Sequence, residues 1–133
     1  MFSWLLGNKS ILKVNFEDIQ MLKKNTFLIN TLEKYNQSCL IKGTLSIHIE
    51  ERKINENISN TQINIIIYGK NTNDNTIIKK YNQLIKLGFK NVYIYSGGLF
   101  EWLCLQDIYG KELFPTIGEE DDILKFKPTT NMI

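Results

Sequence analysis

The most informative stretch of this sequence is Ile63-Asn64-Ile65-Ile66-Ile67-Tyr68, which is apolar and mostly β-branched apart from its asparagine. A strand that is buried on both faces of a parallel sheet has such a nearly continuous apolar sequence. The stretch therefore predicts a central strand. A polar loop, residues 69–74, follows it, and the apolar periodicity after the loop predicts a helix that ends at Gly88, where a left-handed cap residue belongs.

Outward from this strand, the chain alternates predicted strands with predicted helices. Further strands are predicted at residues 11–14, 26–30, 44–49 and 91–95, and further helices after the N-cap residue Asn15 and at residues 99–107. This alternation with short connections indicates an α/β fold, in which helices cover a parallel sheet. Ligands of such sheets bind where strand ends meet helix starts, so the loop at residues 69–74 is the predicted site.

The composition indicates one globular domain and excludes several functional classes. The chain has 133 residues, 43% of them apolar and 23% charged, which is enough to bury a core. The 16 Lys and Arg residues nearly balance the 14 Asp and Glu residues, and this argues against a nucleic-acid partner. The 2 cysteines are fewer than a small secreted domain usually carries. We therefore predict an intracellular, cytoplasmic protein.

The two ends of the chain flank a predicted domain at residues 11–110. Residues 1–10 are apolar but far too short to span a bilayer, and they lack the basic start of a signal peptide. No transmembrane segment is predicted, while a weak membrane contact through Phe2 and Trp4 stays open. Residues 111–133 are predicted to form a C-terminal tail that packs on the domain or is partly flexible.

A distinctive motif runs from Gly88 to Trp102. It consists of Gly88-Phe89, the short strand Asn91-Val92-Tyr93, then Gly97-Gly98 and, four residues later, Trp102. In this order it resembles the rhodanese family, whose members end their sheet in the same way. Residues 41–47, Ile-Lys-Gly-Thr-Leu-Ser-Ile, look like the family's Ile-Pro-Gly-Ala segment, and the resemblance covers residues 11–107. It implies the rhodanese-like three-layer fold, with a central parallel sheet flanked by helices.

Five positions depart from the pattern of the family's sulfurtransferases. Gly69 stands where the catalytic cysteine follows the central strand, and Asp74 stands where the loop often ends in arginine. Residues 30–32, Asn-Thr-Leu, replace an Asp-x-Arg, and Leu40 replaces a histidine. The resemblance therefore implies a catalytically inactive module that binds a protein partner or a small anion. The predicted binding residues are Lys70, Asn71, Thr72, Asn73, Gly97 and Gly98.

The chemistry of the loop residues supports the same interpretation. Sulfur transfer needs a thiolate nucleophile that becomes a persulfide, and Gly69 has no side chain to provide one. Thr72 carries the only hydroxyl of the loop, but no base accompanies it in the sequence. Asp74 is interpreted as the N-cap of the following helix, and Lys70 with the loop backbone as a weak anion site.

The alternative is a sulfurtransferase or sulfur carrier that uses a displaced thiol. Cys39 is predicted to lie in an exposed polar loop, whereas Cys104 has apolar neighbours and is predicted to be buried and inert. His48, the only histidine, is predicted on the strand at residues 44–49 without a second ligand at metal spacing. No metal site and no cofactor are therefore predicted, and an inactive module is favoured over an enzyme.

Overall fold

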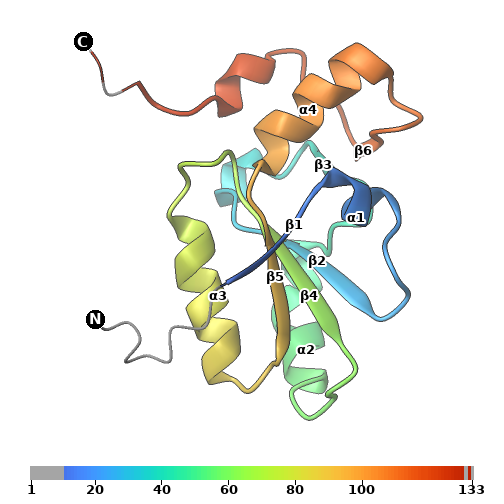
Figure 1. Ribbon diagram of the computed structural model, residues 1–133, viewed down its shortest axis with the longest axis vertical. Helices are drawn as coiled ribbons and strands as arrows, with labels where there is room; N and C mark the ends of the chain where they lie inside the picture. The colour runs from blue at the N-terminus through green and yellow to red at the C-terminus, as the bar shows by residue number, and fades with distance from the viewer. Residues whose placement is uncertain (1–10, 131, 133) are drawn as a thin grey trace.

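The computed structural model describes residues 11–130 and 132, so the membrane contact considered for Phe2 and Trp4 lies outside the described residues (Figure 1). The core of the described part is a twisted parallel sheet. Its strands lie in the order β1 (Leu12–Val14), β5 (Asn91–Tyr95), β4 (Asn64–Tyr68) and β2 (Thr26–Asn30).

The two middle strands, β4 and β5, confirm the prediction from sequence. They pair in parallel over their whole length, from Asn64 beside Asn91 to Tyr68 beside Tyr95. Residues 65–68 of β4 are all at most 5% exposed, because helices cover both faces of the sheet at this position. Such burial on two sides is the reason that the sequence of this strand is a continuous apolar run.

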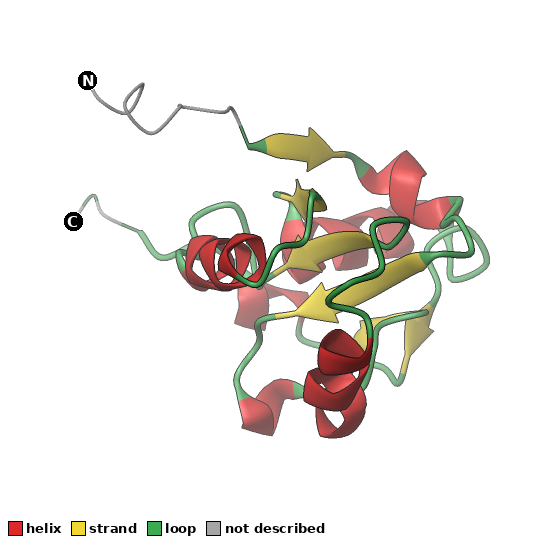
Figure 2. Ribbon diagram, turned by 90° about the horizontal axis from the view of Figure 1, so that it is seen from below, coloured by secondary structure: helices red, strands yellow, loops and turns green. Residues whose placement is uncertain are grey.

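Helices form the outer layers, as the three-layer prediction requires (Figure 2). On one face, α2 (Ile47–Glu56) and α3 (Thr76–Lys86) contribute buried apolar side chains to a cluster with Ile65 and Ile67. On the other face, α1 (Phe16–Gln20) and α4 (Gly98–Tyr109) pack with Ile66 and Tyr68. None of the helices in the described part of the chain is long and apolar enough to cross a membrane.

The C-terminal segment contributes to the core on the α4 side. Strand β6 (Thr116–Ile117) pairs antiparallel with β3 (Leu40–Ile41), which is reached through the short 3-10 helix η2 (Lys34–Asn36). Phe114 and Phe126, the latter in the 3-10 helix η3 (Ile123–Phe126), are only 3% and 2% exposed. The tail thus packs on the domain through these two rings, and the domain boundary at residue 110 stays a prediction.

The predicted strand at residues 44–49 is wrong, because helix α2 begins inside it. Ser46 is the N-cap, and its Oγ accepts the backbone N–H of His48 at 3.2 Å. The apolar alternation of this segment resembled a strand, but a serine followed by the charged residues 50–53 is also a helix start. His48 consequently lies exposed in the first turn of a helix rather than on a strand.

Two predicted helix ends are confirmed. Asn15 caps α1 through a capping box, in which its side chain accepts the N–H of Asp18 and the Asp18 carboxylate accepts the N–H of Asn15. Gly88 follows α3 with a φ of 105°, a conformation that glycine adopts far more easily than other residues. Asn15 thus marks where the chain passes from β1 into α1, and Gly88 marks where it passes from α3 toward β5.

Candidate functional site

The predicted loop joins the carboxyl end of β4 to α3 and rests on the start of α4. The backbone N–H groups of Leu99 and Phe100 donate to the carbonyl oxygens of Gly69 and Lys70 at 2.9 and 2.8 Å. Gly98 has a φ of 68°, and a Cβ there would lie 2.7 Å from the Gly69 carbonyl oxygen. The Gly97-Gly98 turn is therefore buried under the loop, and it serves to let the loop approach α4 closely.

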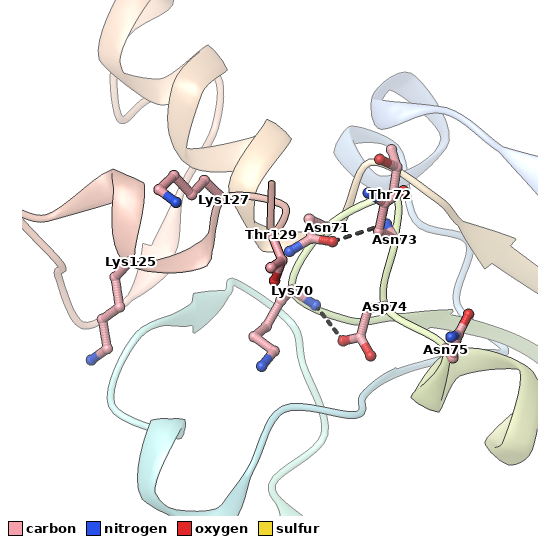
Figure 3. Close-up of a pocket in the computed structure, with 9 residues that line it drawn as sticks. All are labelled: Lys70, Asn71, Thr72, Asn73, Asp74, Asn75, Lys125, Lys127 and Thr129. Atoms are coloured by element: carbon pink, nitrogen blue, oxygen red, sulfur yellow. Dashed lines mark hydrogen bonds between the residues drawn. The ribbon is translucent and has the colours of Figure 1, made fainter. Parts of the chain in front are cut away.

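The carboxylate of Asp74 folds back into the loop (Figure 3). Its Oδ2 accepts the backbone N–H of Lys70 at 2.9 Å, and its Oδ1 accepts the N–H and the hydroxyl of Thr76 at 3.0 and 2.6 Å. The Thr76 hydroxyl also lies 2.8 Å from the Thr31 hydroxyl. The negative group of this loop is thus held from both sides by hydrogen-bond donors.

The predicted role of Asp74 as the N-cap needs a correction. Helix α3 begins at Thr76, and the N-cap position is Asn75, whose side chain makes no capping hydrogen bond. Asp74, the residue before the N-cap, accepts the N–H of Thr76, and it accepts the N–H of Lys70 as well. The prediction missed the second bond because only the three-dimensional loop brings residues 70 and 74 together.

A side chain at position 69 would collide with the neighbouring side chains where they now lie. A Cβ at this buried position would overlap Oδ2 of Asp74, and it would lie 3.0 Å from Asp74 Cγ and 2.9 Å from Thr31 Oγ1. The place of the first side-chain carbon of a cysteine therefore overlaps the carboxylate of Asp74, which would have to shift to admit it. A thiol at position 69 would also lie against a negative charge, which disfavours the thiolate.

Lys70 points out of the loop toward η2. Its ammonium Nζ lies 3.0 Å from Glu33 Oε2, and both side chains are about one third exposed. Their hydrogen bond lowers the pKa of Glu33 and raises the pKa of Lys70. Both groups are charged at neutral pH, and Lys70 lies in the wall of the cleft described next.

Asn71 is buried and connects the loop to the C-terminal tail. Its Nδ2 donates to the Phe126 carbonyl oxygen at 2.8 Å, and its Oδ1 accepts the N–H of Asn73 at 2.9 Å. Thr72 and Asn73, the next two residues, are exposed. The tail therefore fixes the root of the loop while its tip stays open to solvent.

A polar cleft of about 690 Å³ lies between this loop and the tail (Figure 3). The structure thus brings together the predicted residues 70–74, while Gly69, Gly97 and Gly98 do not line the cleft. Sequence reasoning missed the residues that the tail contributes, since no local pattern places residue 125 beside residue 70. The lining residues are Lys70, Asn71, Thr72, Asn73, Asp74, Asn75, Lys125, Lys127 and Thr129.

The two cysteines differ from their predicted environments. Cys39, predicted to be exposed, is only 2% exposed, and its Sγ faces the Gly118 carbonyl oxygen at 3.9 Å. Cys104, predicted to be buried, is partly exposed on α4. Burial raises the pKa of both thiols, with the negative charge of Asp107 adding to the effect at Cys104. Neither cysteine lines the cleft.

The described part of the chain holds no cluster of metal-binding side chains. Among residues 11–130 and 132, no three His, Cys, Asp or Glu side chains gather closely enough to hold an ion. The lining of the cleft offers amide, hydroxyl and ammonium groups and the single carboxylate of Asp74. These groups bind polar ligands by hydrogen bonds and charge.

Comparison with known proteins agrees with this architecture. A model of the rhodanese-like domain family matches residues 15–104 of the 133-residue chain. The chain belongs to the rhodanese-like domain family. No curated protein matches the sequence. In this rhodanese-like domain the matched region includes the whole loop at residues 69–74 and the Gly97-Gly98 turn on which it rests.

Solved structures show the same fold at low sequence identity. The BH2092 protein from Bacillus halodurans superimposes with a TM-score of 0.60 at 18% identity, over 87% of this chain and 83% of that one. The Alr3790 protein from Anabaena sp. gives 0.58 at 19% identity, over 84% and 97%. A solution structure of the rhodanese-like domain of Alr3790 gives 0.57 at 19% identity, over 93% and 89%. At these identities the likeness establishes the fold of this rhodanese-like domain.

Proposed function

We propose that this chain is a catalytically silent rhodanese-like domain that binds a partner through the cleft beside its loop. The observation that carries the proposal is the pair Gly69 and Asp74. Position 69 has no nucleophile, and a Cβ there would overlap the Asp74 carboxylate.

The electrostatics of the loop support the absence of sulfurtransferase activity. A sulfurtransferase of this family, by resemblance, needs a thiolate after β4 and loop N–H groups that stabilise the anion. Here the N–H of Lys70 already donates to Asp74, at 2.9 Å. An incoming anion such as thiosulfate would therefore compete with an internal carboxylate and meet its negative charge.

The preserved architecture around the loop supports a binding role. Gly98 and Asn71 hold the loop between α4 and the tail, although no reactive group remains in it. The exposed Thr72 and Asn73 border a cleft whose size lies within the usual range for ligand sites, about 300–1,000 Å³. The unpaired state of both cysteines is compatible with the reducing, intracellular location that we propose for this protein.

The test is the intact mass of the reduced protein after incubation with thiosulfate. We expect no added sulfur atom, because position 69 has no thiol and the pKa of both cysteines is raised. Cys39→Ser and Cys104→Ser variants serve as matched controls. A sulfur adduct that one of these variants abolishes would contradict silence and identify a displaced thiol as the reactive group.

A further inference from the structure

Lysines outnumber acidic residues among the side chains that line the cleft. Its lining contains 3 lysines, Lys70 from the loop and Lys125 and Lys127 from the tail, but only 1 acidic residue, Asp74. The Asp74 carboxylate is engaged by Lys70 N–H and by Thr76, so it is already neutralised in part by hydrogen bonds. The lining residues therefore carry more positive than negative charge and many hydrogen-bond donors, while Glu33 and Glu120 pair with two of the lysines from outside the lining.

The three ammonium groups are available to a ligand to different degrees. Lys127 is exposed and has no ion-pair partner among residues 11–130 and 132. Lys70 and Lys125 pair with Glu33 and Glu120 at 3.0 and 3.1 Å. Ion pairs at partly exposed positions add little to stability, so a ligand carboxylate can replace those of the protein at small cost.

The spacing of the charges favours an extended ligand over a small anion. The lysines come from two walls of the cleft, and Figure 3 shows Lys70 and Lys125 extending to the same side from separate segments. A single small anion would bind where N–H groups converge, in the loop, but Asp74 occupies that position. The exposed amides and hydroxyls that line the same cleft suit the backbone of a bound chain.

We infer that the cleft binds an acidic segment of a protein partner, a stretch with several Asp or Glu residues. This inference rests on the proposed binding function and names its ligand class. The carboxylates of the segment pair with Lys70, Lys125 and Lys127, and its backbone bonds to Thr72, Asn73 and Thr129. Complementary charge of this kind gives specificity and fast association.

Fluorescence anisotropy with a labelled peptide of four consecutive acidic residues tests the inference. A peptide of the same length with Gln and Asn in their place is the comparison. We expect the acidic peptide to bind at low salt, the neutral one to bind at least about tenfold more weakly, and binding to weaken as salt screens the charges.

Two double variants test whether the lysines of the cleft carry the binding of the acidic peptide. Lys125→Glu/Lys127→Glu is expected to weaken binding of the acidic peptide at least about tenfold. Lys24→Glu/Lys90→Glu makes the same change in net charge at exposed positions that precede β2 and β5, and should leave binding within about twofold. Lys127→Glu alone, which breaks no ion pair among the described residues, gives an intermediate loss if the larger change disturbs folding.

Several outcomes would overturn the inference. One is no preference for the acidic peptide at low salt, and another is an equal loss in the Lys24→Glu/Lys90→Glu control. Self-association that Lys125→Glu/Lys127→Glu abolishes in sedimentation would make a second copy, through its acidic run at residues 119–122, the occupant instead. None of these readouts depends on sulfur, so a thiosulfate adduct would contradict the silent function separately.

Discussion

The variant Gly69→Cys/Asp74→Ser is expected to form a persulfide with thiosulfate at least about tenfold faster than Gly69→Cys alone. In the single variant the new Cβ overlaps Oδ2 of Asp74, so the carboxylate or the thiol must shift. The remaining negative charge beside the thiol raises its pKa and lowers the thiolate fraction. Each unit of pKa that the double variant removes increases the thiolate about tenfold at neutral pH.

The chemistry of this engineered step is simple. The thiolate of the new cysteine attacks the outer sulfur of thiosulfate, the S–S bond of thiosulfate breaks, and sulfite leaves with the electron pair. The freed N–H of Lys70 then faces the anion in place of Asp74. Serine at position 74 keeps an oxygen acceptor for the N–H of Thr76, which preserves the start of α3.

Intact mass against time, with peptide mapping of the adduct, measures this prediction. Asp74→Ser with Gly69 retained is the matched control and should acquire no sulfur. If Gly69→Cys alone reacts as fast as the double variant, Asp74 is not an obstacle, and the filled loop does not explain silence.

Trp102→Ala is expected to lower the free energy of unfolding by about 3–5 kcal/mol. Trp102 is 1% exposed, and its Nε1 donates to the Pro115 carbonyl oxygen at 3.1 Å. Its ring meets Phe114 and Tyr95 edge to face, with centroids 5.1 and 6.3 Å apart. One truncation therefore opens a cavity and removes a hydrogen bond and two ring contacts. The bond to Pro115 and the ring contact with Phe114 join α4 to the segment that carries β6.

Chemical denaturation monitored by far-UV circular dichroism gives the free energy. Trp102→Phe should lose less, because a ring remains in the cavity, and Tyr35→Ala, at an 81% exposed position, should change it by less than about 0.5 kcal/mol. A loss below about 1 kcal/mol for Trp102→Ala would mean that its contact with Phe114 does not belong to the core.

The middle of the fold could be predicted because its determinants are local. β4 and β5 are continuous apolar runs, and Asn15 and Gly88 signal helix ends through chemistry that acts within a few residues. Residues 44–49 were misread because an apolar alternation and a helix start with Ser46 as N-cap coincide there. Local pattern could not decide between them.

The errors about Cys39 and the cleft come from contacts between distant residues, and the error about Cys104 comes from its position on the helix. Cys39 has polar neighbours in sequence, but β3 pairs with β6 and the tail covers the thiol near Gly118. Cys104 follows Leu103 on α4, and the turn of the helix carries it from the buried face toward solvent. The cleft needs Lys125 and Lys127, whose proximity to the loop follows only from the Asn71–Phe126 hydrogen bond and the packing of Phe126.

The most direct test of the central claim is an amide ¹H–¹⁵N spectrum of the wild-type protein during titration with thiosulfate. The structure predicts no specific shift of the Lys70 amide beyond that caused by sodium chloride at equal ionic strength, because its N–H already donates to Asp74. A saturable shift of the Lys70 and Asn71 amides with thiosulfate alone would contradict the claim, since it would mean that an external anion enters the loop.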